Sequence, residues 1–224
     1  MPFEDQELIG IGTGVYTLTD ISTILGLTPA KVSRWINEYW NLHFSKTAQP
    51  SFTSGAGRDR VTNFLTLIEF FTFYQLREEG VSAQRIVKAH HILAKTFQTP
   101  YPFAKSQILT DGKAVLFSGE VGNIIHADET LQIAIKEILS PFCKKVDFNQ
   151  NDMAARFFPM GRNHDVVIDP KRQFGQPIIE GTNILTETIF NLFRGGESVS
   201  MISRLYNLKP GQVNDAINYH RAAA

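Results

Sequence analysis

The amino-acid sequence predicts a mainly α-helical protein with small β elements: an N-terminal winged helix-turn-helix plus a C-terminal small helical domain with a second helix-turn-helix. Two observations support this. The stretch "DISTILGLTPAKVSRWI" begins at Asp20, and the similar stretch "MISRLYNLKPGQVNDAI" begins at Met201. In both, apolar residues recur at helical spacing, and a Gly or Asn before Leu-x-Pro separates two short helices. In addition, the chain after Asp165 is broken by Asp-Pro, Phe-Gly, Gln-Pro and Glu-Gly, which favours tight turns over long strands.

The composition is that of an ordinary folded protein and excludes several classes. The 224 residues are 43% hydrophobic, and 22 basic residues balance 22 acidic ones, so any case for nucleic acid must rest on a local patch. We find no apolar run of membrane-spanning length, and the acidic start "MPFEDQELIG" does not resemble a secretory signal. A single cysteine, Cys143, fits a reducing compartment. We therefore expect a cytoplasmic protein without a membrane segment.

The first predicted domain, residues 13–98, begins with the helix-turn-helix. Thr19 is the expected N-cap of its first helix, and Gly26 is the expected left-handed stop. Thr28 and Pro29 are the expected cap and first residue of the second helix. That second helix is the candidate recognition helix, because it follows the turn and carries polar and basic residues.

The region after the second helix is the predicted wing. It is rich in Ser, Thr, Gly and Pro, and residues 31–60 contain five basic and two acidic side chains. Since phosphate neutralisation supplies much of the affinity for DNA, this locally basic stretch is the expected DNA surface. Recognition-helix side chains would enter the major groove, small hydroxyls would contact phosphate, and wing arginines would hold the flanking backbone. The expected DNA-binding residues are Thr28, Lys31, Ser33, Arg34, Asn37, Lys46, Arg58 and Arg60.

Two further helices complete the first domain, at about residues 62–77 and 82–97. Gly80 is expected to end the first of them, and Ser82 to cap the second. The first is unusually aromatic, and we interpret part of its aromatic stripe as a dimer face. A homodimer is also expected because one small recognition helix reads few bases, and two half-sites multiply specificity.

The sequence of the connecting region, residues 99–164, predicts mixed α/β structure. Asp111-Gly112 suggests a hairpin, and "TLQIAIKEILSPF" suggests a helix that ends before Pro141. Short strands and turns are expected afterwards, and "MGRNHD", residues 160–165, is the candidate linker to the last domain.

The last predicted domain, residues 165–221, contains a short helix with Thr186 as its cap and Gly195 as its stop. The second helix-turn-helix follows, with helices beginning near Ser198 and Pro210. Where the first copy has Lys31, Ser33, Arg34 and Asn37, the second has Gln212, Asn214, Asp215 and Asn218. Without cations to anchor phosphates, we expect this copy to contact protein rather than DNA.

No catalytic constellation is present, so we do not predict an enzyme. The histidines lack the spacing of a zinc site, and no glycine-rich loop is followed by Lys-Ser or Lys-Thr. Cys143 fits a buried apolar position better than a nucleophile, since no histidine lies in an obvious partner motif. The sequence therefore predicts neither a metal site nor a cofactor.

The order of motifs resembles a bacterial antitoxin family over nearly the whole chain. "YTLTDISTILGLTPAKVSRWI" and "VTNFLTLIEFFTFYQLREEGVSAQRI" are similar to the MerR-type winged helix-turn-helix of some VapB-type antitoxins. Ile168-Asp169-Pro170, the turn from Gly175 to Thr182 and Gly196-Glu197-Ser198 resemble the small helical domain, once called a domain of unknown function, that pairs with PIN-like toxins.

This resemblance implies a function. The protein would neutralise a PIN-like ribonuclease toxin encoded nearby, and it would bind operator double-stranded DNA to repress their shared promoter. The resemblance implies that the C-terminal domain contacts the toxin. Cationic side chains of this domain would suit the acidic, metal-binding cleft of such a toxin. The alternative is a stand-alone MerR-like transcription regulator with a ligand-sensing or dimerising middle region. The expected partner-binding residues are Arg172, Phe174, Arg194 and Arg204.

Overall fold

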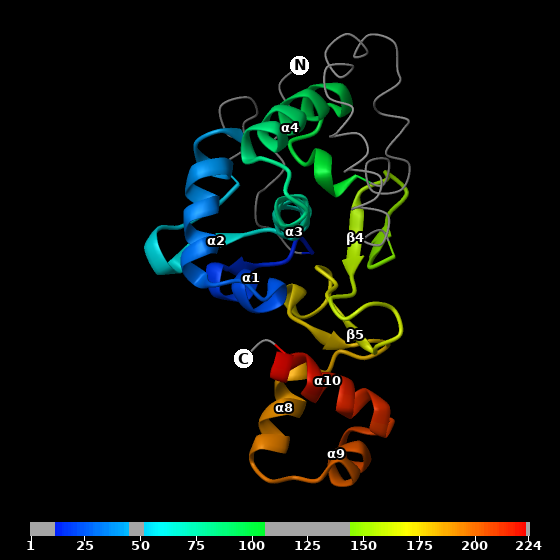
Figure 1. Cartoon of the computed structure of the whole chain (residues 1–224). Helices are drawn as coiled ribbons and strands as arrows, with labels where there is room; N and C mark the ends of the chain where they lie inside the picture. Colours follow the sequence, from blue (N-terminus) through cyan, green and yellow to red (C-terminus); the bar gives the residue numbers. More distant parts are fainter. Residues whose placement is uncertain (1–11, 45–51, 106–143, 223–224) are drawn as a thin grey trace.

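A computed structural model describes residues 12–44, 52–105 and 144–222, and the structural statements below concern these residues. Helices predominate in these ranges, where the strands form three two-stranded antiparallel sheets (Figure 1). The expected mainly α class with small β elements is confirmed. The hairpin at Asp111-Gly112, the helix before Pro141, and Cys143 lie outside the described residues.

The first helix pair consists of α1 (Leu18–Leu25) and α2 (Pro29–Trp35). The cap of α1 is Thr17 rather than the expected Thr19. Thr17 and Asp20 form a capping box, in which the Thr17 hydroxyl accepts from the Asp20 N–H and the Asp20 carboxylate accepts from the Thr17 N–H at 2.8 Å. This reciprocal pair satisfies two backbone donors, which a cap at Thr19 would not achieve. Gly26 is left-handed at φ +63° and ends α1 as predicted.

The second helix pair consists of α9 (Val199–Tyr206) and α10 (Pro210–Ala222), and it repeats the first pair in detail. Ser198, near which the helix was expected to begin, caps α9 at the position that matches Thr17. Asn207 matches Gly26 and is likewise left-handed, at φ +53°. Four apolar positions are buried in one or both copies, and the matched pairs are Ile21 with Ile202, Leu27 with Leu208, Val32 with Val213, and Ile36 with Ile217.

A short β pairing closes the first helix pair against the following loop. The π-helix η1 (Ile36–Asn41) continues α2, and β1 (Tyr16–Thr17) pairs with β2 (Val61–Thr62). Ser54 forms a bridge with Val61, so residues 54–61 form a small hairpin that contains the 3-10 turn η3 (Gly57–Asp59). This hairpin lies in the region expected for a wing; the name winged helix-turn-helix stays a prediction.

Helix α3 (Phe64–Glu78) passes through the centre of the N-terminal part, with α1 and α2 on one side and β4 on the other (Figure 1). It is capped by Asn63, whose side chain accepts from the Thr66 N–H at 2.9 Å. The interpretation of its aromatic stripe as a dimer face is wrong for the buried phenylalanines. A central helix must be apolar on all sides, and these rings pack within the chain. The buried aromatic residues of α3 are Phe64, Phe70, Phe71 and Phe73.

Helix α4 (Ala83–Phe97) follows, with Ser82 as its cap as expected. The 3-10 turn η4 (Pro102–Ala104) then packs against α3 and α4. Its contact with α3 is polar as well as apolar, because the Glu69 carboxylate accepts from the backbone N–H groups of Phe103 and Ala104, at 2.5 and 3.2 Å. Glu69 itself is fully buried. The buried Glu69 therefore anchors η4, which follows α4, to the central helix α3.

Short strands connect the two helical parts, as the sequence predicted. Strand β3 (Val146–Phe148) pairs with β4 (Ala154–Phe157), and β5 (Val166–Val167) pairs with β6 (Ile178–Ile179). Phe157 and Ile168 exchange two backbone hydrogen bonds, at 2.9 and 2.8 Å, which join β4 to the chain just after β5. Residues 160–165, the candidate linker, contain hydrogen-bonded turns: the Gly161 N–H donates to the Phe158 carbonyl, and the His164 N–H donates to the Gly161 carbonyl.

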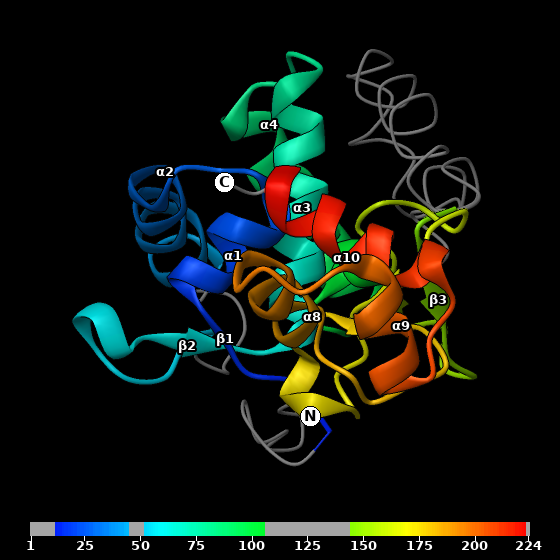
Figure 2. The same cartoon turned by 90° about the horizontal axis from the view of Figure 1, so that it is seen from below.

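The C-terminal unit has a small core of its own. Helix α8 (Thr186–Arg194) ends at Gly195 as predicted, but Thr186 is its first residue rather than its cap. The Thr186 hydroxyl is buried and donates to the Pro177 carbonyl at 3.2 Å, so it is not available to cap the helix. Figure 2 shows α8, α9 and α10 gathered together in the view from below. The buried core residues of this unit are Ile179, Ile189, Ile202, Leu208, Val213, Ala216 and Ile217.

A close joint connects the C-terminal unit to the start of the first helix pair. The Val15 N–H donates to the Phe174 carbonyl at 2.8 Å. The neighbouring Gly175 is buried against Tyr16, to the extent that a Cβ added at Gly175 would lie 2.1 Å from the Tyr16 hydroxyl oxygen. Backbone therefore meets an aromatic side chain here with no room for an additional carbon atom.

Candidate nucleic-acid and partner interfaces

The outer side of α2 carries three of the expected DNA-binding residues, two of them exposed. Thr28 and Arg34 are exposed and Ser33 is half-buried. The Thr28 hydroxyl accepts from the Lys31 backbone N–H at 3.3 Å, which caps the helix and leaves its own O–H free to donate. Arg34 makes no ion pair with any described residue, so its guanidinium is available for an anion.

Lys31 lies differently from the sequence-based expectation. Its ammonium group is 3.4 Å from the Glu78 carboxylate at the end of α3. The same group lies over the rings of Trp35 and Tyr74, at 4.8 and 5.0 Å from their centroids. An ammonium group between a carboxylate and two aromatic faces is attracted back to the protein. Contact with DNA would require Lys31 to exchange Glu78 for phosphate.

The hairpin and α2 are brought together by Arg60 and Asn37. The Arg60 guanidinium donates to the Asn37 side-chain oxygen, although 22 residues separate them in sequence. This contact places Arg60 of the hairpin beside Asn37 of η1, just after the C-terminal end of α2. Arg58 lies on η3 and its side chain is not described, and Lys46 lies outside the described residues.

The matching face of the second helix pair is used inside the protein. Asp215, which occupies the position of Arg34, accepts from the Asp165 backbone N–H at 2.9 Å and lies 2.9 Å from the His164 ring. Gln212, which matches Lys31, accepts from the Lys209 backbone N–H at 3.0 Å and so supports the start of α10. The expectation that this copy contacts protein therefore holds for Asp215, although the contact is intramolecular.

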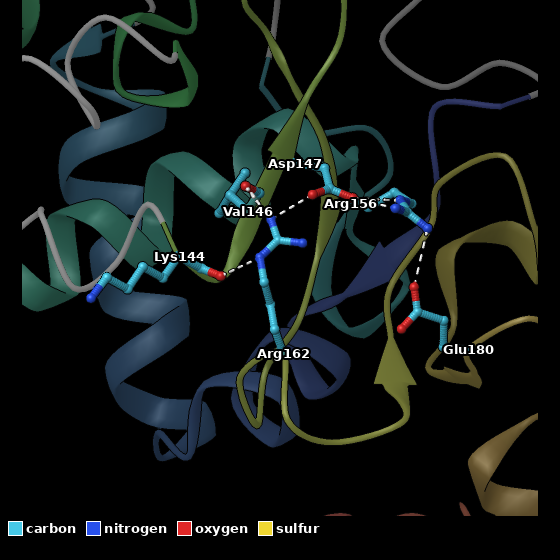
Figure 3. A network of polar contacts seen from close by, with 6 residues as sticks. All are labelled: Lys144, Val146, Asp147, Arg156, Arg162 and Glu180. Carbon is cyan, nitrogen blue, oxygen red and sulfur yellow. Dashed lines mark hydrogen bonds and ion pairs between the residues drawn. The ribbon is translucent and has the colours of Figure 1, made fainter.

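A polar network that the sequence did not predict stabilises the β3–β4 hairpin (Figure 3). Asp147 accepts from Arg156 and Arg162, Arg162 also donates to the Lys144 and Val146 carbonyls, and Arg156 lies 3.4 Å from Glu180. Partial burial by itself would raise the pKa of Asp147, but the hydrogen bonds and charges of the two arginines outweigh burial and lower this pKa. The network therefore joins the hairpin to the C-terminal unit through Glu180.

The four residues expected to bind a partner lie on three different elements. Arg172 donates to the Asn183 side chain at 2.8 Å, and Phe174 follows it on η5 (Gln173–Gly175) with 75% of its surface exposed. Arg194 ends α8 and lies over Phe190, and Arg204 is exposed on α9. Arg172 and Phe174 thus belong to one surface, whereas Arg194 and Arg204 lie on separate helices.

His220 links α10 to α8 and predicts a pH-dependent stability. Its ring stacks on Phe190 at 5.0 Å and its Nε2 lies 3.0 Å from the Thr186 hydroxyl. Burial lowers the pKa of His220, partly opposed by Glu187. The unfolded state then takes up a proton near the ordinary value of about 6.5 while the folded state does not, so stability is lost as pH falls below that value.

We expect the melting temperature to decrease between pH 7.5 and pH 5.5, and to decrease less in His220→Phe, which keeps the stacking. The decrease should not vanish, because burial also lowers the pKa of His91. Thermal denaturation of both proteins across this range measures the difference. Equal pH slopes would contradict the assignment to His220.

Within the described ranges, no group of three or more His, Cys, Asp or Glu side chains is placed to hold a metal ion. Among the same residues, no helix combines the length and apolar character needed to cross a bilayer.

A family profile and several known proteins are similar to this chain. The profile of a family described as "Protein of unknown function (DUF433)" matches residues 166–220, which run from β5 to α10. The chain is 26% identical over 233 residues to the "Putative antitoxin VapB45" of Mycobacterium tuberculosis, covering 96% of this chain and 97% of that protein. It is also 25% identical to the "Uncharacterized protein Rv2308" of the same organism, covering 92% and 89%.

A solved structure shares the fold. The crystal structure of Rv2018 from Mycobacterium tuberculosis superposes with a TM-score of 0.71 at 23% identity, covering 90% of this chain and 96% of that one. The arrangement of both helical parts and the connecting strands is thus found in a second protein.

Proposed function

We propose that this protein is the antitoxin of a type II toxin-antitoxin system. It would neutralise a PIN-like ribonuclease toxin through its C-terminal unit, and it would bind operator DNA as a cytoplasmic homodimer to repress its own promoter. The observation that carries the proposal is the similarity to "Putative antitoxin VapB45", which extends over nearly the full length of both chains.

The different surfaces of the two helix pairs support the proposal. The outer side of α2 has an unpaired Arg34, exposed Thr28 and a nearby Arg60, as a phosphate-binding surface needs. The matching side of α10 holds Asp215 in contact with residues 164–165. One copy is therefore suited to DNA, whereas the matching face of the other copy packs inside the chain.

The test of the partner is co-expression of the tagged full chain with the product of the adjacent gene, followed by purification and a growth assay. We expect the two proteins to purify together and growth arrest by the adjacent product to be relieved. If the adjacent product does not bind, while the protein retains its own upstream DNA with steep salt dependence, the protein is a stand-alone regulator instead.

Arg34→Ala is expected to weaken binding to a duplex of the upstream DNA about tenfold, and to reduce the slope of log affinity against log salt by about one. The reason is that Arg34 is the α2 cation with no ion-pair partner among the described residues. Titration by fluorescence anisotropy at several salt concentrations measures both quantities.

Glu78→Gln is the matched control, because it removes the carboxylate that lies 3.4 Å from Lys31. This variant should bind the same duplex as well as or better than the wild-type protein. Equal affinities for all three proteins would place the DNA contact elsewhere.

A further inference from the structure

The turn that carries Phe174 has an unusual backbone. Three consecutive residues adopt positive φ: Gln173 at +46°, Phe174 at +54° and Gly175 at +83°. Glycine adopts this region freely, but a residue with a Cβ is strained in it, and a bulky aromatic residue especially so. Asparagine or glycine would suit position 174 better. Local conformation therefore gives no reason for a phenylalanine here.

The turn is fixed from several directions. The Phe174 carbonyl accepts from the Val15 N–H at 2.8 Å, and the Gly175 N–H donates to the Arg172 carbonyl at 2.8 Å. The side chains of Arg172 and Gln173 both donate to Asn183, at 2.8 and 3.1 Å. These contacts hold the strained conformation in place, as strained segments require.

This fixed turn directs the Phe174 ring into solvent. Its side chain is 75% exposed, more than any other large hydrophobic residue in the described part of the chain. The ring cannot fold inward by a shift of the turn, because Gly175 already lies against Tyr16 without spare room. Packing within the chain therefore gives no reason for the phenylalanine either.

The surroundings of Phe174 are basic. Residues 169–176 contain Lys171 and Arg172 against a single acid, Asp169. Lys171 is exposed and makes no ion pair with any described residue. A rigid aromatic side chain with cations beside it has the composition of a binding hot spot, in which little side-chain entropy is lost on association.

We propose that Phe174 is the anchor of the partner interface, and that it inserts into an apolar pocket with carboxylates at its rim on the partner protein. This inference rests on the proposed function, since it assigns a residue and a pocket chemistry to the toxin contact. The backbone strain of the turn is retained because it presents the ring. Lys171 and Arg172 meet the acidic rim and accelerate association.

The test compares Phe174→Asn with Leu42→Asn, using the purified product of the adjacent gene as the probe. Leu42 is also an exposed apolar residue, at 49%, and lies on the C-terminal side of η1. We expect Phe174→Asn to weaken binding at least about 30-fold, as loss of a hot spot does, and Leu42→Asn to bind like the wild-type protein. The melting temperature of Phe174→Asn should equal or exceed that of the wild-type protein, because asparagine tolerates the left-handed region.

The outcomes separate the two proposals. If the wild-type protein binds the probe and Phe174→Asn binds equally well, the anchor is refuted and the proposed function stands. If the wild-type protein does not bind the probe, both fail. If Phe174→Asn binds the probe normally but changes the oligomeric state in sedimentation, the ring is covered by a second copy of this chain, and the anchor proposal is overturned.

Discussion

Replacing Gly175 with alanine is expected to lower the free energy of unfolding by roughly 2–4 kcal/mol, from backbone strain and overpacking together. The new Cβ would lie 2.1 Å from the Tyr16 hydroxyl oxygen and 2.7 Å from its Cζ, which real atoms do not tolerate. Tyr16 is fully buried and cannot swing outward. Either Tyr16 or the whole turn must move, and the joint between the C-terminal unit and the first helix pair opens.

Gly181→Ala is the matched control for this effect. Gly181 has a similar φ of +78°, but a Cβ there meets nothing within 4 Å. Its substitution should therefore produce only the conformational part, about 1 kcal/mol. Urea denaturation of the two variants measures the difference between their free energies of unfolding. This difference is the cost of the steric clash with Tyr16.

Tyr16→Phe completes a double-mutant cycle with Gly175→Ala. The Tyr16 hydroxyl is buried and has no hydrogen-bond partner in the described structure, so its removal should change stability little. In the Gly175→Ala background it removes the nearest atom and should restore part of the loss, since Cζ still lies close. Additive effects of the two changes would show that the collision does not occur.

Glu69→Ala is expected to lower the free energy of unfolding by about 2–5 kcal/mol, because it leaves two buried backbone N–H donors without an acceptor. Glu69 is fully buried, accepts from the backbone of η4 and lies 2.9 Å from the His90 ring. Burial raises the pKa of Glu69, partly opposed by His90 and the two backbone donors. Alanine would leave two backbone N–H groups and the His90 ring, which stacks on Phe44, without their partner.

Glu69→Gln separates the hydrogen bonds from the charge. The amide oxygen retains an acceptor for the Phe103 and Ala104 N–H groups, so this variant should lose clearly less stability than Glu69→Ala. Guanidinium denaturation of both variants gives the comparison. Equal losses would mean that the contact with His90, rather than the anchoring of η4, accounts for the role of Glu69.

The sequence by itself determined the local features, because these depend on neighbouring residues only. The repeat that begins at Asp20 and Met201 predicted two helix pairs, and the left-handed Gly26 and Asn207 and the cap at Ser198 follow from side chains within one turn of the helix. The Gly- and Pro-rich stretch after Asp165 likewise predicted tight turns rather than long strands. The wrong caps, Thr19 and Thr186, were errors of two residues and one residue: Thr17 offers a second hydroxyl near Thr19, and the Thr186 hydroxyl is bonded to the Pro177 carbonyl instead.

Only the tertiary structure decided what each surface residue contacts. Lys31 and Glu78, Arg60 and Asn37, and Asp215 and His164 are each far apart in the chain, and no spacing rule connects them. The aromatic stripe of α3 shows the same limit, because periodicity reports that a face is buried and not which partner buries it. Burial and ion pairing depend on which distant segments of the chain lie next to each other. The packing of the whole core decides which segments these are.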